Sequence, residues 1–387
     1  MTWSSFQDGA LLRTFEIARA ADDLLFSADG EAYIDLLSGG GTVLLGHCRP
    51  AIVRALRGQL DQLWNTGAVP VALRAEAAAA AERVLPSRLR LTGLYSTGME
   101  AAEFALRMAR RLTGRRVAVG FDHSMHGKSQ ATAALGWPND LATLTDFRRL
   151  PYLPEIGESE VLERVGATLE DRAVAAVFIE PLLGSFGAHA PSRAFGTTLG
   201  ELCASHGTLL VVDEILTGFH RCGPAFLHTE LGLAPDLLLV GKAMGNGFPV
   251  AGVAADRRRS VPAGALAGST FADNPLAAAV VVATLAEMED CGLPALVAGV
   301  EATMRNELAG LAGCGAVLRG RGALWILEFP DAERVGRVME HLLRARVIAS
   351  PTARFLRLMP PATISDAHLR QACAAVCEAC RATAPAA

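Results

Sequence analysis

The sequence has few aromatic residues, no excess of basic charge and no long apolar segment. Phe, Trp and Tyr together make up 6% of the 387 residues, and the formal net charge is −4. Domains that bind nucleic acid usually carry a basic surface, so this composition argues against nucleic acid as a partner. The longest apolar segment, Pro275 to Leu285, is shorter than the roughly 18–20 residues that a membrane span needs. We therefore expect no association with membranes.

Signals for secretion and for metal binding are also missing. Residues 1–8 contain neither a basic nor an apolar region of the kind that opens a secretory signal. The eight cysteines are scattered along the chain, unlike those of a disulfide-stabilised scaffold. Cys373, Cys377 and Cys380 fall near one face of a predicted helix and have no second pair of ligands nearby, so we expect thiols and no metal site. These features predict a cytoplasmic protein.

The chain is long enough for a large core and more than one domain. Short apolar segments alternate with helical patterns from Leu91 to Ala255, which predicts an α/β fold with a mainly parallel sheet covered on both sides. From about residue 291 the pattern changes to that of a smaller α+β domain. We expect an N-terminal arm with part of the small domain at 1–50, a large domain at 51–290 and a C-terminal small domain at 291–387.

Local patterns predict individual elements. An Asp-Gly pair at residues 29–30 indicates a hairpin within Ser27–Leu36, and residues 126–138 read as a loop. The predicted strands are Leu91–Tyr95, Val117–Phe121, Val174–Ile179, Leu209–Val212, Leu237–Val240, Gly320–Phe329, a strand near Val347 and Phe355–Met359. The predicted helices are Ala51–Leu63, Val71–Leu85, Met99–Leu112, Val161–Glu170, Ala194–Ser205, Asn274–Met288, Leu296–Leu311, Ala332–Ala345 and Ser365–Ala382.

The segment 208–242 is the most informative part of the sequence. A short apolar strand ends at Asp213, and a second one, 235–240, is followed by Gly241 and Lys242. Both patterns are typical of buried parallel strands, whose C-terminal ends form the edge of the sheet where ligands bind. Asp213 and Lys242 would therefore meet at one edge. A lysine and an aspartate at one place could form a plain ion pair. They could also hold a cofactor that needs both an amine and a carboxylate.

The order of residues in this segment resembles the class III (ω-amino) branch of the fold-type I aminotransferases. In that family an apolar strand is followed by Asp-Glu-Val/Ile and a Thr-Gly-Phe-x-Arg turn, and later by Gly-Lys, a glycine-rich turn and Pro. Here residues 213–221 read DEILTGFHR and residues 241–249 read GKAMGNGFP. The resemblance to this family extends from about Asp29 to Pro361.

The resemblance implies a pyridoxal 5′-phosphate enzyme. Lys242 would form a Schiff base with the cofactor aldehyde, and Asp213 would keep the pyridine nitrogen protonated so that the ring withdraws electrons. Lys242 would then move the proton during the exchange of an amino group between an amine or amino-acid donor and a keto-acid or aldehyde acceptor.

Other motifs imply how the cofactor is held. Thr97, Gly98 and Met99 match the family's phosphate-binding turn at a helix N-terminus, with Met99 in place of the usual hydroxyl residue. An ordinary helix cap would also explain this turn.

The faces of the cofactor ring are assigned in the same way. Met125 stands where the family has an aromatic residue over one face of the ring, with His126 next to it, and Ile215 would pack on the other face. Glu180 would support the pocket from the end of a strand. A core methionine and a structural carboxylate are the alternatives for Met125 and Glu180.

The last two motifs concern the partner subunit and the substrate. The family places a hydroxyl at the position of Thr270 on the phosphate of the neighbouring subunit, which implies a homodimer with shared active sites. Arg357 stands where the family binds a substrate carboxylate, although a surface arginine would give the same pattern. Ser185 replaces a family glutamate that neutralises this arginine when an ω-amine binds, so Arg357 is expected to remain available for a carboxylate.

Three other activities fit parts of these patterns. An aminomutase of the glutamate-1-semialdehyde type would move an amine within one molecule, and it also needs no glutamate at residue 185. A decarboxylase on the same scaffold would release a gas. A protein that binds the cofactor without turnover would not need the full set of Asp213, Lys242 and Arg357.

Overall fold

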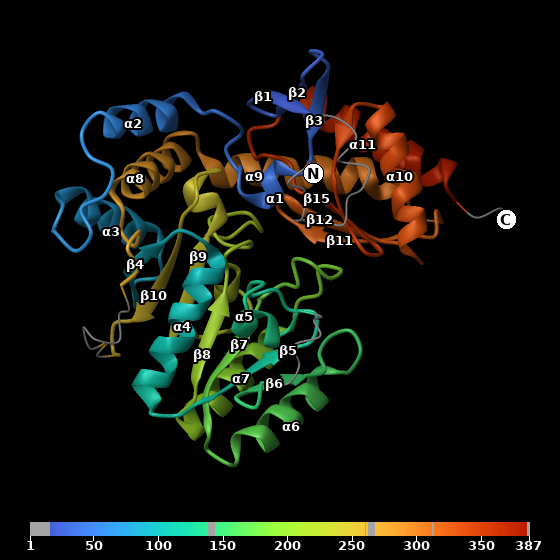
Figure 1. Ribbon diagram of the computed structural model, residues 1–387. Coiled ribbons are helices and arrows are strands. Elements are labelled where there is room, and N and C mark those ends of the chain that lie inside the picture. The colour runs from blue at the N-terminus through green and yellow to red at the C-terminus, as the bar shows by residue number, and fades with distance from the viewer. Residues whose placement is uncertain (1–15, 138–143, 260, 262–267, 312, 385–387) are drawn as a thin grey trace. The chain divides into compact units, whose positions relative to one another are not determined.

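The computed structural model describes residues 16–137, 144–259, 261, 268–311 and 313–384. The chain forms two compact units, shown with their elements in Figure 1. The terminal unit comprises Met1–Pro50, His220–Gly223 and Met288–Ala387, and the central unit comprises Ala51–Phe219 and Pro224–Glu287. The first part of the expected N-terminal arm, residues 1–15, lies outside the described residues.

The described part of the central unit contains a seven-stranded sheet. Its strands in spatial order are β4 (Leu89–Tyr95), β10 (Ala251–Asp256), β9 (Leu237–Gly241), β8 (Leu209–Asp213), β7 (Val174–Ile179), β5 (Val117–Phe121) and β6 (Phe147–Leu150). Pairs from β9 through β8, β7 and β5 to β6 are parallel, whereas β10 runs antiparallel to both of its neighbours. The expected mainly parallel sheet is therefore confirmed, with β10 as its one reversed strand among the described residues.

Helix α4 (Gly98–Thr113) crosses this sheet over strands β7 to β10 (Figure 1). Its buried face consists largely of small residues, among them Ala101, Ala105 and Ala109. They pack in one core cluster with Phe178, Val211 and Leu239 of the sheet. Small side chains allow a close approach of helix and sheet, which fits the Ala- and Gly-rich composition.

The other described helices of the central unit lie before, between and after its strands. They are α2 (Pro50–Leu60), α3 (Ala72–Val84), α5 (Gln130–Ala134), α6 (Glu158–Leu169), α7 (Arg193–His206), the 3₁₀ helices η2 (Leu227–Thr229) and η3 (Lys242–Gly245), and α8 (Pro275–Asp290). Helix α5 lies inside the segment 126–138 that was expected to be a loop. Ser129 starts it with a capping box, in which its side chain accepts a hydrogen bond from the Thr132 backbone amide.

The described part of the terminal unit has two four-stranded sheets. One joins β1 (Ile17–Ala21), β2 (Leu24–Ser27), β3 (Ala32–Asp35) and β13 (Val347–Ile348), and the other joins β11 (Val317–Arg321), β12 (Leu324–Glu328), β15 (Phe355–Leu358) and β14 (Ser350–Thr352). Strands β2 and β3 form the expected hairpin. The helical elements are α1 (Ser38–Gly41), α9 (Leu293–Glu307), η5 (Leu308–Leu311), α10 (Ala332–Arg344) and α11 (Asp366–Ala382).

The cysteines of α11 lie inside the terminal unit. Cys373, Cys377 and Cys380 are buried and free, as expected for thiols on one helical face. Burial raises the pKa of Cys373 and Cys380 to about 12, which keeps both as unreactive thiols. Within the described ranges, the helices are too short or too polar to cross a bilayer.

Candidate active site

The carboxylate of Asp213 and the amine of Lys242 belong to neighbouring parallel strands. Asp213 is the last residue of β8 and pairs with Leu239 of β9. The Glu214 backbone amide donates to the Leu239 carbonyl at 3.0 Å, so the register continues past the strand end. Lys242 follows β9 directly and has a φ of +43°, in the left-handed region that is uncommon for a residue with a side chain. The two residues therefore leave the sheet at the same edge.

Asp213 is buried and held by two hydrogen bonds. Its Oδ2 lies 2.9 Å from Nδ1 of His126, and its Oδ1 accepts the Ile215 backbone amide at 3.0 Å. His126 is also buried, and its ring meets Phe178 edge-on with 5.7 Å between the ring centroids. The sequence placed His126 beside the cofactor ring but did not show its pairing with Asp213. A carboxylate fixed in this way is suited to hold a proton on a bound cation.

The side chain of Glu180 links the loop that contains Met125 to the loop that contains Gly184. Its Oε1 accepts the Met125 backbone amide at 2.7 Å, and its Oε2 accepts the Gly184 amide at 3.3 Å. Burial raises the pKa of Glu180 to about 7. The charge of Asp213 adds to this rise in pKa, and His126 opposes it. Glu180 therefore fixes the loop that carries Met125 and His126.

The N-terminus of α4 is capped at the predicted phosphate turn. Thr97 Oγ1 accepts the Glu100 backbone amide at 3.1 Å, and the Glu100 side chain accepts the Ser96 amide at 2.9 Å. A Cβ atom at residue 98 would lie 2.8 Å from Cδ1 of Ile215, so any other residue there would force the Ile215 side chain to shift. This contact brings the helix start against Ile215, next to Asp213. Met99 is exposed and lies against Gly127.

Ser185 lies in the loop that follows β7. The preceding Gly184 packs closely, because a Cβ atom there would lie 2.3 Å from Cδ2 of Leu216 and would force that side chain to shift. The following Phe186 stacks on His123 with 3.6 Å between ring centroids and 9° between ring planes, and His123 Nε2 lies 2.7 Å from Glu155. Neither stacking partner was identified from the sequence. The stack fixes the backbone beside Ser185.

Thr270 and Arg357 each have a hydrogen-bond partner of their own. Thr270 is exposed, and its carbonyl accepts a hydrogen bond from the Asn65 side chain at 2.8 Å. Arg357 belongs to β15 of the terminal unit, where its Nη2 donates to Ser350 Oγ at 2.7 Å. Arg357 is 9% exposed, unlike a surface arginine.

The central group suits pyridoxal phosphate. The backbone amides at the start of α4 can bind a phosphate. A lysine amine and a buried carboxylate on adjacent strand ends match the aldehyde and the ring nitrogen of that cofactor. Within the residues that the structure describes, no cluster of three or more His, Cys, Asp or Glu side chains is arranged to hold a metal ion.

Comparisons with known proteins point the same way. The chain is 30% identical to 2-aminoadipate transaminase of Pseudomonas putida, over 94% of this chain and 95% of that protein. It is also 30% identical to acetylornithine aminotransferase of Methanopyrus kandleri, over 95% and 93%. Ornithine aminotransferase from Toxoplasma gondii, solved with partial occupancy of PLP at its active site, superposes with a TM-score of 0.85 at 27% identity, over 99% and 92% of the two chains.

The family model for aminotransferase class-III matches residues 7–380, nearly the whole chain. These similarities agree with the sheet-edge lysine and carboxylate described above. The chain belongs to the class III aminotransferases and is a pyridoxal-phosphate-dependent aminotransferase of fold type I.

Proposed function

We propose that Lys242 and Asp213 are the catalytic residues of this aminotransferase. The observation that carries the proposal is their position: Asp213 ends β8, and Lys242 directly follows the adjacent parallel strand β9. When bound, pyridoxal phosphate supplies an aldehyde and an electron-withdrawing ring. The Lys242 amine would hold this aldehyde and would accept and return the substrate proton. Asp213, held by His126 at 2.9 Å, would keep the proton on the ring nitrogen.

The surrounding residues would hold and orient the cofactor. The backbone amides of Thr97, Gly98 and Met99 would bind the phosphate at the start of α4. Met125 and Ile215 would cover the two faces of the ring. Glu180 supports Met125 through the hydrogen bond to its amide at 2.7 Å.

The substrate is proposed to carry a carboxylate in both halves of the reaction. Arg357 presents a guanidinium, the group that binds carboxylates in bidentate fashion. Ser185, at the position where related enzymes carry a glutamate, has no charge with which to neutralise it. We therefore infer an amino-acid donor and a keto-acid acceptor.

We further propose that the enzyme is a cytoplasmic homodimer. The support for the dimer is an exposed apolar face of the central unit formed by Trp64, Val69 and Phe271, which are 61–63% exposed. Thr270 adjoins this face and would reach the cofactor phosphate of the partner subunit. The support for the compartment is the set of free cysteines.

The assignment of Lys242 can be tested with unusual clarity, because Lys128 and Lys242 are the only lysines of the 387-residue sequence. Reduction of the loaded protein with borohydride, followed by peptide mass spectrometry, should place the cofactor mass on the peptide that contains residue 242. Lys242→Ala should remove this adduct and lower amino transfer by about 100-fold or more.

Lys128→Arg is the matched control, because Lys128 is exposed and lies 5.3 Å from the ring of Trp137. It should keep both the adduct and the activity. An adduct on Lys128, or transfer retained by Lys242→Ala, would disprove the assignment. Net transfer of the amino group to an added keto acid separates an aminotransferase from an aminomutase.

A further inference from the structure

Arg221 has a buried guanidinium whose hydrogen-bond acceptors are three peptide carbonyls. Its Nη1 donates to Pro360 at 2.8 Å and to Ala323 at 3.2 Å, and its Nη2 donates to Gly41 at 3.1 Å. The residue is 0% exposed, and burial lowers the pKa of the guanidinium to about 10. A buried cation is costly unless its donors are used, so these carbonyls define the place of Arg221 in the terminal unit.

The three carbonyls belong to three separate segments of that unit. Gly41 ends α1, Ala323 precedes β12, and Pro360 follows the end of β15. The end of β15 has two more links to α1 and the residues before it. The Met359 amide donates to the Leu36 carbonyl at 2.7 Å, and Ser38 Oγ donates to the Met359 carbonyl at 2.6 Å.

These contacts bear directly on the position of Arg357. Arg357 lies three residues before Pro360 on β15 and pairs across the sheet with Ser350 of β14 and Ile326 of β12. Ser350 holds the tip of the Arg357 side chain, whereas Arg221 and Ser38 hold the backbone that follows it. The direction in which β15 presents Arg357 is therefore fixed from both the side chain and the main chain.

We propose that Arg221 is a positioning residue for the substrate carboxylate. By binding the carbonyls of Gly41, Ala323 and Pro360 it aligns the guanidinium of Arg357 with the carboxylate. The inference rests on the proposed role of Arg357. Lysine cannot replace Arg221, because a single ammonium does not reproduce the planar fork that spans three carbonyls.

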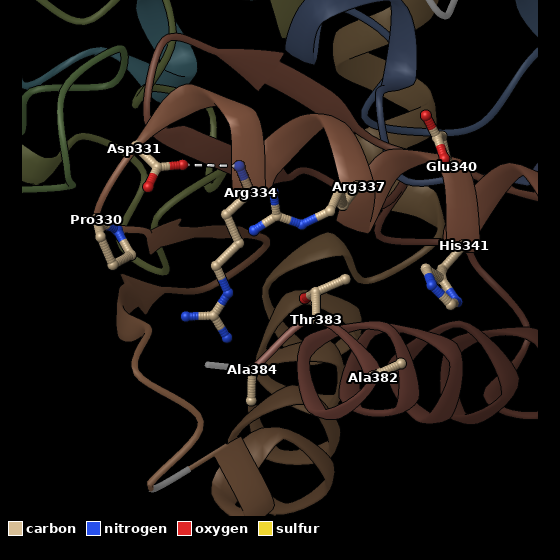
Figure 2. Close-up of a pocket in the computed structure, with 9 residues that line it drawn as sticks. All are labelled: Pro330, Asp331, Arg334, Arg337, Glu340, His341, Ala382, Thr383 and Ala384. Atoms are coloured by element: carbon tan, nitrogen blue, oxygen red, sulfur yellow. Dashed lines mark hydrogen bonds between the residues drawn. The ribbon is translucent and has the colours of Figure 1, made fainter. Parts of the chain in front are cut away.

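Arg334 offers a matched comparison in the same unit. It is 2% exposed, and it also donates to three carbonyls, those of Gly315 at 3.0 Å, Cys380 at 3.2 Å and Cys314. It lines a pocket between α10 and the end of α11 (Figure 2). None of these three carbonyls belongs to β15. A loss of stability alone should therefore affect Arg334→Lys and Arg221→Lys alike.

The test compares two amines of equal chain length in single-turnover bleaching of the bound cofactor. β-Alanine carries a carboxylate and propylamine does not. In the loaded enzyme, Arg221→Lys should raise the β-alanine concentration for half-maximal rate by about 10-fold or more, since small misplacements of binding groups are costly. The limiting rate with β-alanine should change less than about twofold. The limiting rate and the half-maximal concentration of propylamine should also change less than about twofold. Ser38→Ala should shift the β-alanine value in the same direction by a smaller factor.

Arg334→Lys should melt at a lower temperature than the wild type but keep its preference between the two amines. If Arg221→Lys behaves like Arg334→Lys while Arg357→Lys loses the preference for β-alanine, Arg221 is only structural and the inference is wrong. If Arg357→Lys also keeps the preference, or the wild type has none, the proposed carboxylate site itself is wrong. Ser38→Ala decides the matter if Arg221→Lys does not fold.

Discussion

The carboxyl group of Glu180 shows how burial couples the active site to pH. Ordinary glutamate ionises with a pKa of 4.5, but burial raises the pKa of Glu180 to about 7. Between these values the folded protein binds more protons than the unfolded chain. The contribution of Glu180 to the free energy of unfolding therefore decreases as the pH rises from about 4.5 to 7. The change corresponds to about 3 kcal/mol.

Replacement of Glu180 by glutamine should remove this dependence. Glutamine stays neutral, so the stability of Glu180→Gln relative to the wild type should increase by about 3 kcal/mol between pH 4.5 and 8. Urea unfolding of the cofactor-free proteins at several pH values measures the difference. Glu163→Gln, at an exposed position on α6, is the control and should show a flat difference. A flat difference for Glu180→Gln as well would show that Glu180 does not titrate in this interval.

At the residue scale, the sequence identified those site residues that follow recognisable strand ends. Asp213 and Lys242 stand directly after apolar segments, so their meeting at a sheet edge could be expected. The pairing of His126 with Asp213 joins residues 87 positions apart, and no local pattern reports such a contact. The same is true of Arg221, whose carbonyl partners lie more than 100 positions away along the chain.

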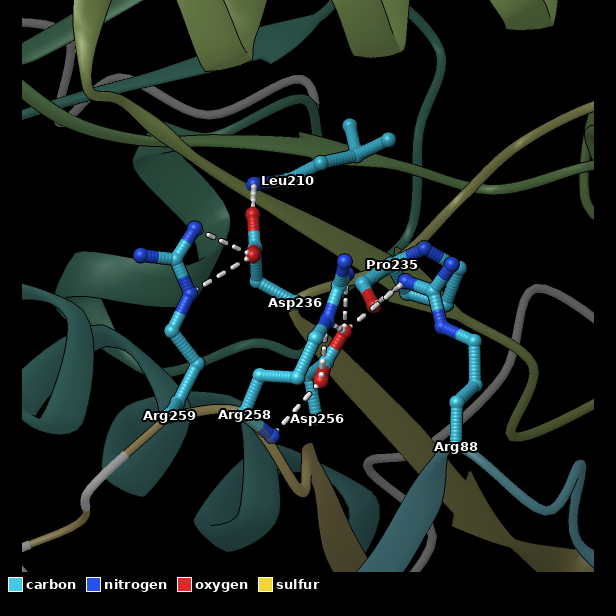
Figure 3. A network of polar contacts seen from close by, with 7 residues as sticks. All are labelled: Arg88, Leu210, Pro235, Asp236, Asp256, Arg258 and Arg259. Atoms are coloured by element: carbon cyan, nitrogen blue, oxygen red, sulfur yellow. Dashed lines mark hydrogen bonds and ion pairs between the residues drawn. The ribbon is translucent and has the colours of Figure 1, made fainter.

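At the element scale, charged residues connect the strand ends that lie opposite the active site (Figure 3). Asp236, just before β9, accepts the Leu210 amide of β8 at 2.9 Å and the Arg259 guanidinium at 2.7 Å. Asp256, at the end of β10, binds Arg258, which lowers the pKa of Asp256 to about 2. The network therefore connects β8 and β9, whose other ends carry Asp213 and Lys242, with the end of β10.

Loss of the Asp236 carboxylate should weaken this edge without disturbing the chemistry. In Asp236→Ala the buried Leu210 amide loses its side-chain acceptor, which should lower the free energy of unfolding by about 1–3 kcal/mol. Asp236→Asn keeps an acceptor and should lose less. Thermal melting and the rate per loaded site are the measurements. A large fall in that rate, with the melting temperature unchanged, would contradict this assignment.

Most elements could be predicted because their patterns are local. The strands β7, β8 and β9 are continuous apolar segments, and α4 combines a Thr cap with a buried stripe of small residues. Helix α5 could not be expected, since five residues give too little periodicity. Its capping box pairs Ser129 with Thr132, whereas the recognisable sequence pattern has Glu or Gln at the second position. Strand β6 was also missed, because Phe147–Leu150 is an edge strand with two exposed arginines at its centre. The antiparallel direction of β10 depends on the chain connection rather than on its residues.

At the scale of the whole molecule, the terminal unit joins distant parts of the chain. Strand β13 pairs in parallel with β3, with Val347 opposite Ile34. His368 on α11 lies 2.8 Å from Asp23, near the other end of the sequence. Such pairings are formed over more than 300 residues and leave no signal in local periodicity. The expected boundaries at residues 50 and 290 stay a prediction.

Trp64, Val69 and Phe271 form an exposed apolar face on the central unit. Its two segments are linked, because Asn65 donates to the Thr270 carbonyl at 2.8 Å and Arg74 donates to both Val69 and Asp273 carbonyls at 2.6 Å. The large side chains are therefore held outward on an ordered backbone. Exposed apolar side chains gathered in this way typically mark an interface.

We expect a second copy of the chain to cover this face. Phe271→Asp would bury a charge in such an interface and should convert the enzyme from twice the chain mass of 40.6 kDa to the monomer mass in analytical ultracentrifugation. Amino transfer should fall with the dimer, because Thr270 would no longer reach the partner's cofactor. Val317→Asp, at an exposed apolar position of the terminal unit, is the control and should leave the mass unchanged. An active wild type that sediments as a monomer would rule out the shared site.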